Sequence, residues 1–583
     1  PTMWTAWASP PANGVNINAP YYWNDPLQPA AIPNSTFYYG APPFSYDTMR
    51  TGFIPFQDNL FCIPMISLLY EKPGRGITLA LSPEDQLIDL ELHTNTDGQI
   101  RFDRLSNRIS KNNPIRLSYD LLIHDNAWQD GLHWMRNQYP AYFYPENPLA
   151  NRMAGTGAYA AYSKETLDFD AEKMKQMAFT VNWQASFDFP FMGLFLPPVK
   201  RDETWKRFGG GTISVNEMDR FAKSYHDKGF HVLNYFNVTE FGTAIKFPPD
   251  SNLQPPGNWQ DATSYLYNHF KAAILPMPKK AITDPALKNI PGAVPYFTWE
   301  YGIAMDCGDS TYSHFLLDQL DRHIREIPNS SGICIDRLDW LRMFNENADD
   351  GISWFDGKPV RSLISSWKKL APQLASRLHG SNKVLFVNNH TKRLDILKQV
   401  DGLFDEFTYS GSALNLTAFL TLSKPALGWT DNASTIRKEG GDHFFQKYLY
   451  MGVFPMCPFP LNDHSITSAP DIDSLYLDYG PMLNRLKGKS WYLQPSAVAI
   501  KDKQAKINLF KIDGGYAIPV VYGNTGTVEL TLKKLPGMHS SEKLTIYYPG
   551  KSEPVTTRIR FRNGQAKLNL ALEKLFLRRL TSL

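Results

Sequence analysis

Three carboxylates stand where predicted strands end, and a pair of carboxylates is what cleavage of a glycosidic bond requires. Asp336 follows the apolar stretch 332–335, and Asp405 and Glu406 follow 402–404. One carboxyl group must attack the sugar or activate water, while the other protonates the leaving oxygen. We therefore predict Asp336 as the nucleophile and Glu406 as the general acid/base. Asp405 is the alternative, because strand alternation turns only one of two adjacent side chains inward.

Polar and aromatic residues follow the other predicted strands in the same way. One such residue has an even chance of being only a helix cap or a turn residue, but seven strand ends in series are harder to explain by capping. Arg337 could equally form a surface ion pair, and His390 could simply begin a helix. The predicted substrate-binding residues are Trp183, Asp188, Glu240, Trp299, Glu300, Asp306, Arg337, Asp339, Trp340, Asn388, Asn389, His390 and Trp429.

Apolar strands alternate with helices between residues 151 and 488, which is typical of an α/β fold. The predicted strands are 178–183, 231–236, 297–305, 332–335, 383–387, 402–404, 424–429 and 450–455, and the predicted helices include 217–228, 312–327, 360–379 and 391–398. Eight repeats without a glycine-rich dinucleotide motif predict a (β/α)8 TIM barrel. In such a barrel the active site lies at the C-terminal ends of the strands.

Shorter strands separated by Pro, Asn, Asp and Gly lie on both sides of the barrel region. Residues 1–150 are predicted as an N-terminal β-sandwich with an irregular start and a helix at 128–144. Residues 489–583 are predicted as a small C-terminal β-sandwich. The Pro- and Asn-rich stretch 247–295 interrupts the barrel, either as a lid or subsite wall or as a passive insertion.

The composition excludes several other classes of protein. The 60 basic and 57 acidic residues give a net charge of +3, so nothing favours nucleic acid as a partner. The sequence contains no run of 18 apolar residues, so no membrane span is predicted. Aromatic residues reach 13% of the chain, and aromatic rings can bury the C–H faces of sugars, although they also fill large cores.

Metal sites and cofactors receive little support from the sequence. The four cysteines have no zinc-binding spacing, so no cofactor and no catalytic metal are expected. Asn345, Asn347, Asp349 and Asp356 loosely follow a calcium loop. However, Asp350 stands where that loop needs glycine, and Asp356 replaces its closing glutamate. A structural Ca²⁺ is therefore only a minor alternative.

The order of β-sandwich, barrel and β-sandwich resembles the α-galactosidase and α-glucosidase clan of glycoside hydrolases. Met305-Asp306, the helix after it and Gly332-Ile333-Cys334-Ile335-Asp336 are similar too. The resemblance implies retaining hydrolysis of α-linkages, with Asp336 as nucleophile and Asp405 or Glu406 as acid/base. Cys334 stands where the α-galactosidase branch commonly has lysine, and the clan's second carboxylate is usually aspartate, so the sugar and its linkage stay open.

An oligo- or polysaccharide is therefore the expected partner, and a secreted or periplasmic location is expected from that function alone. The oligomeric state is not predicted. The main alternative is a carbohydrate-binding protein on a barrel that has lost catalysis, which would keep the aromatic residues without needing the carboxylates. Metal-dependent chemistry on the same barrel is a further alternative.

Overall fold

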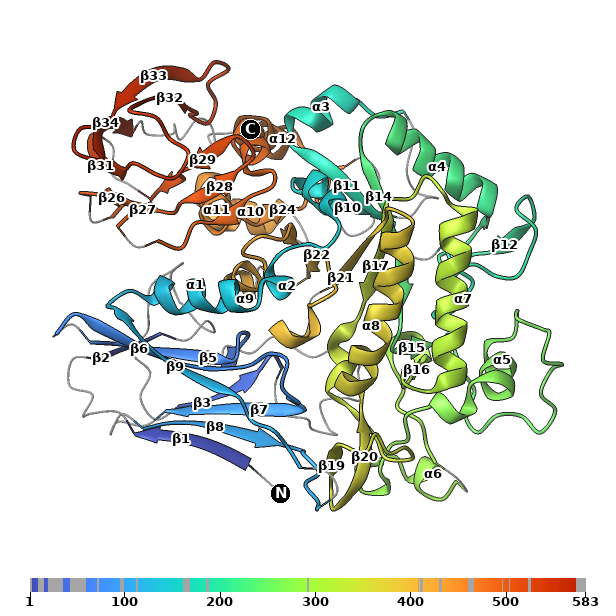
Figure 1. Ribbon diagram of the computed structural model, residues 1–583. Helices are drawn as coiled ribbons and strands as arrows, with labels where there is room; N and C mark the ends of the chain where they lie inside the picture. The colour runs from blue at the N-terminus through green and yellow to red at the C-terminus, as the bar shows by residue number, and fades with distance from the viewer. Residues whose placement is uncertain are drawn as a thin grey trace.

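The structure is a computed structural model. It describes residues 3–8, 15–18, 35–41, 59–70, 73–94, 99–111, 114–160, 168–184, 188–290, 293–388, 390–406, 408, 413–428, 433–459, 466–494, 496–502, 504–522 and 526–572. A (β/α)8 barrel occupies the middle of the chain, with an N-terminal β-sandwich on one side and C-terminal β-sheets on another (Figure 1).

Eight parallel strands form the barrel in chain order. They are β10 (Thr156–Ala160), β11 (Phe179–Gln184), β14 (His231–Asn237), β17 (Gly332–Asp336), β21 (Val384–Asn388), β22 (Gly402–Asp405), β23 (Ala426–Gly428) and β24 (Phe454–Pro455). A parallel bridge between Gly157 and Met456 joins the last strand to the first. Gly157 suits this closure because a Cβ there would meet Leu427 at 2.3 Å.

One predicted strand is wrong and one barrel strand was not predicted, and the two errors offset each other. The first barrel strand is β10, whose small residues give no apolar run to recognise. The stretch 297–305 lies outside the barrel. It holds the 3-10 turn η5 (Trp299–Tyr301), and its strand β16 (Ile303–Ala304) pairs antiparallel with β15 (Glu240–Phe241). Glu300 and Tyr301 have positive φ, which breaks the extended path. Asp336 therefore still ends the fourth strand.

Helices cover the outside of the barrel, and several of them begin at a side-chain cap. In α4 (Val215–Asp227) Ser214 and Glu217 form a reciprocal capping box, and Asp309 caps α7 (Ser310–Glu326). The other described helices of the barrel are α3 (Ala171–Gln176), α8 (Leu363–Gly380), α9 (Ala413–Leu420), α10 (Ala433–Glu439), α11 (Gly441–Met451) and α12 (Pro470–Leu483). The helix predicted at 391–398 is only the 3-10 turn η7 (Leu394–Ile396).

The insertion after β14 packs against the barrel through aromatic residues. It carries α5 (Ala262–His269), η3 (Lys271–Ala273), η4 (Lys279–Ala281) and α6 (Pro285–Lys288). Phe270 contacts Tyr312 and Phe315 of α7 with ring centroids 5.4 and 4.7 Å apart. These contacts fix the base of the insertion on the barrel wall.

The N-terminal sandwich consists of two sheets, ordered β1-β8-β7-β3-β4 and β2-β5-β6-β9. The strands are β1 (Met3–Ala8), β2 (Val15–Asn18), β3 (Ser35–Tyr39), β4 (Leu60–Phe61), β5 (Met65–Tyr70), β6 (Arg75–Leu81), β7 (Asp89–Thr94), β8 (Gln99–Leu105) and β9 (Tyr119–Asp125). The predicted helix at 128–144 divides into α1 (Trp128–Gln138) and α2 (Pro140–Phe143), because Pro140 interrupts it.

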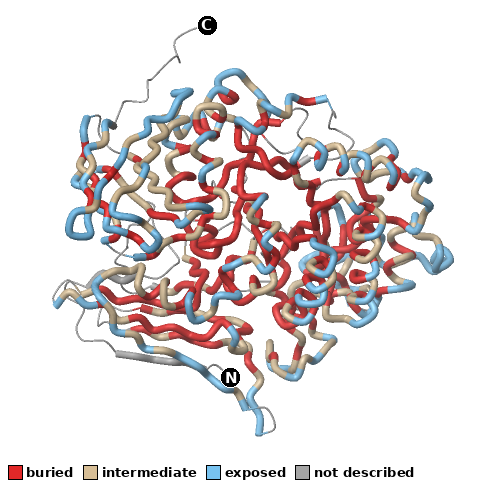
Figure 2. Tube along the Cα trace, turned by 45° about the horizontal axis from the view of Figure 1, so that its top comes forward, coloured by how far each residue is buried: buried red, intermediate tan, exposed pale blue. Residues whose placement is uncertain are grey.

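Short antiparallel strands follow the barrel and form small sheets. These strands are β25 (Ser490–Trp491), β26 (Val498–Ile500), β27 (Lys506–Ile507), β28 (Phe510–Ile512), β29 (Gly515–Ala517), β30 (Val520–Val521), β31 (Gly526–Lys533), β32 (Ser541–Ile546), β33 (Val555–Arg560) and β34 (Gln565–Leu572). Figure 2 shows that they are less buried than the barrel strands and the N-terminal sheets. No helix of the described residues combines the length and apolar character that crossing a membrane needs.

One buried arginine links the N-terminal sandwich to the barrel. Arg393 donates to the carbonyl oxygens of Leu87 and Ile88, at 2.6 and 3.1 Å, and pairs with Asp395 at 2.9 Å. Its guanidinium also lies 4.5 Å from the centre of the Tyr39 ring. Gly40 permits this approach, because its φ is +77° and a Cβ there would collide with the arginine side chain.

We expect Arg393→Met to lower the free energy of unfolding by about 3–5 kcal/mol, because it leaves buried acceptors and a buried carboxylate short of a partner. Arg437→Met is the matched control, since it breaks an exposed pair with Asp471 and should leave the free energy of unfolding nearly unchanged. Denaturant and thermal unfolding of both variants measure the difference. Equal, small losses would show that the junction does not stabilise the fold.

Candidate active site

Three adjacent barrel strands bring two carboxylates and one amide together at the C-terminal mouth. Asp336 ends β17, Asn388 ends β21, and Glu406 directly follows β22. The Asn388 Nδ2 donates to Asp336 Oδ1 at 2.8 Å and to Glu406 Oε2 at 2.9 Å. One oxygen of each carboxylate and one nitrogen of His390 all lie within 4.8 Å of one another. The predicted pair therefore converges on one point.

Asp336 is buried, and both of its carboxylate oxygens accept hydrogen bonds. Its Oδ2 accepts a hydrogen bond of 3.1 Å from the Tyr235 hydroxyl, while its other oxygen accepts from Asn388. Burial and, to a lesser extent, the nearby charge of Glu406 raise the pKa of Asp336 to about 6, against the lowering effects of His390, Arg337 and Asn388. Burial likewise raises the pKa of Tyr235, so its hydroxyl keeps its proton and acts as a donor.

Glu406 has a more polar environment than Asp336. Its side chain is 26% exposed, and its Oε2 lies 2.6 Å from His390 Nε2. Burial alone would raise the pKa of Glu406, but the hydrogen bond and charge of His390 together with the Asn388 amide hold it below its usual value. The two carboxylates are thus inequivalent: the pKa of the one on β17 is raised, and the pKa of the one after β22 is lowered.

Asn237, the last residue of β14, forms a second set of polar contacts near the pair. Asn237 donates to Glu240 Oε2 at 2.8 Å and to the Tyr235 hydroxyl at 3.4 Å. Arg337 Nη1 lies 4.0 Å from the other oxygen of Glu240, whose side chain is fully buried. Arg337 has a φ of +57°, and this left-handed conformation directs the chain away from the strand immediately after Asp336.

Sequence reasoning missed Tyr235 and Asn237 as site residues. Only Glu240, which follows the same predicted strand, is among the predicted binding residues. The available signal was their spacing, since residues two apart on a strand point to the same side. Tyr235 and Asn237 have this spacing on β14, and the Tyr235 hydroxyl contacts Asp336.

Asp405 does not join the pair. Its carboxylate forms a buried ion pair with Lys392 at 2.7 Å and accepts a hydrogen bond from Thr417. The alternation of side chains along β22 turns it away from Asp336, as the rule predicts for one member of the pair. The alternative assignment of Asp405 as acid/base is therefore wrong.

Several predicted substrate-binding residues have structural contacts instead. Trp183 and Trp340 are fully buried, and Trp183 packs against Tyr159, Tyr235 and Phe404 inside the barrel. Asp188 pairs with Arg207 at 3.2 Å. The carboxylate of Asp306 is buried and accepts from Asn345, Arg361, Ser366 and the amide of Gly308. These side chains position neighbouring loops and have no surface for a sugar.

The remaining candidates divide into exposed and undescribed residues. Trp299 and Glu300 are exposed on the insertion, where Trp299 packs edge-on against Phe208 at 5.7 Å. Asn389, Trp429 and the side chain of Asp339 lie outside the described residues. Of the predicted set, the structure therefore gathers Asp336, Glu406, Asn388, His390, Arg337 and Glu240 at the mouth.

The calcium loop considered from the sequence has other contacts. Asp349 forms an ion pair with Arg108 at 2.7 Å, and the amide nitrogen of Asn345 points to Asp306. The segment makes a hairpin of β19 (Ser353–Phe355) and β20 (Lys358–Ser362), with the side chain of Asp350 bonded to Ser353 and to the amide of Ser362. Asn345 and Asp349 therefore have protein partners, and these contacts give no support for Ca²⁺.

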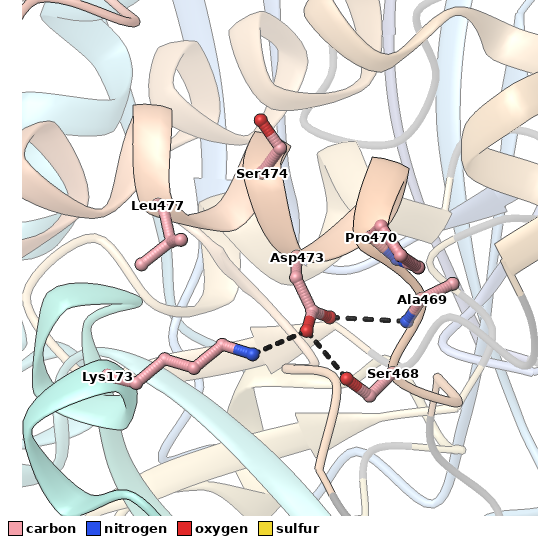
Figure 3. Close-up of a pocket in the computed structure, with 7 residues that line it drawn as sticks. All are labelled: Lys173, Ser468, Ala469, Pro470, Asp473, Ser474 and Leu477. Carbon is pink, nitrogen blue, oxygen red and sulfur yellow. Dashed lines mark hydrogen bonds and ion pairs between the residues drawn. The ribbon is translucent and has the colours of Figure 1, made fainter.

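A pocket between α3 and α12 is separate from the carboxylate pair (Figure 3). Its two charged residues, Lys173 and Asp473, pair with each other at 2.6 Å, and Ser468 bonds to the same carboxylate oxygen. The charges of this pocket are therefore already neutralised, and it offers no second pair of carboxyl groups.

Comparison with known proteins identifies the fold. No protein-family model matches the sequence, and no curated protein matches it. The cycloalternan-degrading enzyme from Trueperella pyogenes has a similar structure, with a TM-score of 0.53 at 10% identity over 98% of this chain and 81% of the other. The α-N-acetylgalactosaminidase NagBb from Bifidobacterium bifidum, free of ligand, has a TM-score of 0.50 at 10% identity, over 87% and 79%. The predicted resemblance to barrel glycoside hydrolases is confirmed at the level of the fold.

The burial of Asp336 predicts a pH-dependent gain in stability on neutralising it. Its pKa of about 6 in the folded chain exceeds the ordinary 3.8, so its contribution is fully present below pH 4 and is lost as pH rises through 6. We expect Asp336→Asn to be more stable than the parent at pH 7.5, by up to about 3 kcal/mol, with the difference shrinking towards pH 4.

Urea unfolding at a series of pH values measures this difference. Asp227→Asn is the control, because Asp227 is an exposed carboxylate on α4 whose folded pKa is not raised. A gap between Asp336→Asn and the parent that is the same at pH 4 and pH 7.5 would contradict the prediction.

Proposed function

We propose that this protein is a retaining glycoside hydrolase that acts on α-linked oligo- or polysaccharides. The observation that carries the proposal is the pair Asp336 and Glu406, bridged by one amide with ligand oxygens within 4.8 Å at the mouth of the barrel. Retaining enzymes place the two carboxyl groups about 5–5.5 Å apart, whereas inverting enzymes leave about 6.5–9.5 Å for a water molecule. The close spacing favours direct attack by a carboxylate.

The proteins with similar structures support the same proposed function. The cycloalternan-degrading enzyme is also known in a structure described as a complex with a covalent intermediate, which matches this chain with a TM-score of 0.51 at 10% identity. The name of the second neighbour specifies an α-linkage. Both points belong to those proteins, and we extend them to this chain only as support for the proposal. A secreted or periplasmic location is proposed on the same basis.

In the first step Asp336 attacks the anomeric carbon while Glu406 protonates the glycosidic oxygen. The C–O bond to the leaving group breaks, and an ester forms between the sugar and the Asp336 carboxylate. In the second step Glu406 removes a proton from water, which attacks the same carbon and releases Asp336. Two displacements restore the original anomeric configuration, and no redox or metal cofactor enters the balance.

His390 explains how Glu406 can donate a proton although its pKa is lowered. The 2.6 Å contact lets the imidazole and the carboxylate share one proton, which can be written as imidazolium and carboxylate or as imidazole and carboxylic acid. Closing the site over a sugar removes water and disfavours the charge-separated form. The proton then lies on Glu406, where the leaving oxygen needs it, while Asp336 is the ionised member of the pair.

Asp336→Asn and Glu406→Gln should each lower kcat by at least about a thousandfold, since each removes a group needed in the transition state. Asp227→Asn is the control and should keep full activity. The substrates are a panel of aryl α- and β-glycosides and α-linked polysaccharides, with the product anomer followed by NMR. Inversion at the anomeric carbon would refute the mechanism, and sugar binding without turnover in the parent would favour a carbohydrate-binding protein.

Azide separates the two roles. With Glu406→Ala and an activated aryl glycoside, azide should attack the glycosyl-enzyme and give a glycosyl azide of the substrate's configuration. With Asp336→Gly it should attack the substrate directly and give the opposite configuration. The reverse pattern would exchange the assignments of the two carboxylates.

The pH dependence of kcat/KM should show an acidic limb near pH 6, because Asp336 must be ionised to attack and its pKa is about 6. Activity should fall about tenfold per pH unit below that value. In Asn388→Ala the limb should move to higher pH, because the amide that stabilises the ionised Asp336 is lost. An unchanged limb in this variant, measured with the same substrate, would contradict the role given to Asn388.

A further inference from the structure

Three potential metal ligands lie on one face of the N-terminal sandwich. They belong to other strands than the residues of the barrel mouth and are far from those residues in the sequence. Glu91 and His93 are two residues apart on β7, so they point the same way, and Asp103 lies directly opposite Glu91 on β8. The intervening residues Leu90, Leu92 and Phe102 are fully buried on the other face, in the core. The sheet itself therefore sets the positions of these three side chains.

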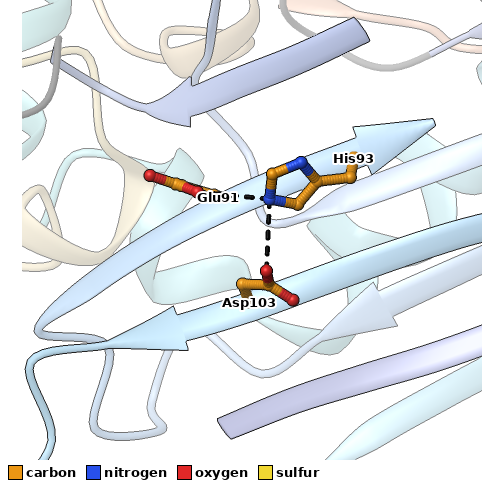
Figure 4. Close-up of side chains that lie close together, drawn as sticks. All are labelled: Glu91, His93 and Asp103. Atoms are coloured by element: carbon orange, nitrogen blue, oxygen red, sulfur yellow. Dashed lines mark hydrogen bonds and ion pairs between the residues drawn. The ribbon is translucent and has the colours of Figure 1, made fainter. Parts of the chain in front are cut away.

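The three side chains converge on a single point (Figure 4). His93 Nε2 lies 3.2 Å from Glu91 Oε2 and 3.2 Å from Asp103 Oδ2, and all three ligand atoms lie within 4.8 Å of one another. Zn²⁺ holds nitrogen and oxygen ligands at about 2.0–2.1 Å in a tetrahedron, which separates ligand atoms by about 3.3 Å. The spacing thus matches two edges of a metal coordination shell.

The surroundings of the cluster also suit a cation. Thr36 Oγ1 lies 2.9 Å from His93 Nδ1, so an Nδ1–H can donate to the hydroxyl while Nε2 keeps its lone pair for a metal. Arg101 pairs with the second oxygen of Asp103, Oδ1, at 2.8 Å, and leaves Oδ2 facing the histidine.

We propose that Glu91, His93 and Asp103 bind a divalent transition-metal ion, Zn²⁺, with water in the fourth position. One imidazole and two carboxylates suit zinc, and side chains that are 12–24% exposed leave solvent access for its entry. The ion would join β7 to β8 and stabilise the sandwich. This site is separate from the proposed glycosidase chemistry and does not depend on it.

The competing arrangement is a protonated histidine held between two carboxylates without a metal. Both use the same three side chains, but only the metal site takes up Zn²⁺ and loses stability when a chelator removes the ion. Titration with Zn²⁺ and with a chelator therefore distinguishes the two.

The test is calorimetric titration of ZnCl2 into the full-length chain, first freed of metal with a chelator and dialysed, at pH 7.5. We expect one Zn²⁺ bound at this site with micromolar or tighter Kd, and at least a thirtyfold loss of affinity in His93→Gln. His124→Gln is the matched control, since His124 lies on β9 in the other sheet and bonds to Thr78. It should bind as the parent does.

Two further measurements complete the test. Zn²⁺ should raise the melting temperature of the parent by several degrees and leave that of His93→Gln unchanged, and Co²⁺ should give the visible absorption of a four-coordinate ion only when His93 is present. Asp336→Asn serves as a second control for the Asp336, His390 and Glu406 group at the barrel mouth, and it should keep this Zn²⁺ site.

Three outcomes would overturn the proposal. These are absence of Zn²⁺ binding by the parent, binding that His93→Gln leaves unchanged, and binding lost in Asp336→Asn but kept in His93→Gln. If His93→Gln does not fold in chelator, Glu91→Gln takes its place, and unchanged Zn²⁺ affinity in that variant would likewise refute the site.

Discussion

A single side-chain amide between two carboxylates determines what this barrel mouth can do. Two carboxyl groups this close repel each other when both are ionised, and Asn388 reduces that repulsion by giving one N–H to Asp336 and one to Glu406. The amide is itself held at the end of a buried strand that lies between the strands carrying the two acids. The arrangement of these three neighbouring strands therefore sets the distance between the two carboxylates, on which the proposed chemistry depends.

The chain beyond Asn388 extends this constraint into the N-terminal sandwich. His390 contacts Glu406, Lys392 forms a buried pair with Asp405, and Arg393 reaches the carbonyl groups of the sandwich. The backbone is held as well, since the Lys392 amide donates to Gly40 at 2.7 Å and the Leu394 amide donates to Cys62 at 2.9 Å. The loop that carries His390 is thus supported by a domain whose described residues add no group to the carboxylate pair.

The sequence permitted the barrel, its flanking sheets and the positions of both acids to be predicted, because apolar strands followed by carboxylates are a local signal. Asp405 and Glu406 could not be separated from sequence, since the choice depends on which of two neighbours faces Lys392. The first strand was missed because Thr156–Ala160 is built from small residues. Tyr235 was missed because a tyrosine within an apolar strand looks like core until its hydroxyl is seen to face Asp336.

Asp188 and Asp306 show the opposite limit of sequence-based prediction, because they are predicted to bind substrate but instead contact other protein groups. Each follows a predicted strand as a binding residue would, yet each is satisfied by protein groups, and only their partners, distant in sequence, reveal it. The burial of Trp183 is of the same kind, because its position at a strand end does not say whether the ring faces the opening or the interior.

The crossover between β21 and β22 has no full helix, only the turn Leu394–Ile396. On this flank the usual outer layer of a (β/α)8 barrel is replaced by contacts from Tyr39, Cys62 and Leu87 of the sandwich. The smallest autonomous folding unit that contains the two acids is consequently larger than the barrel. Excising residues 151–488 would strip one wall of its cover, so the sandwich and the barrel must be engineered as one piece.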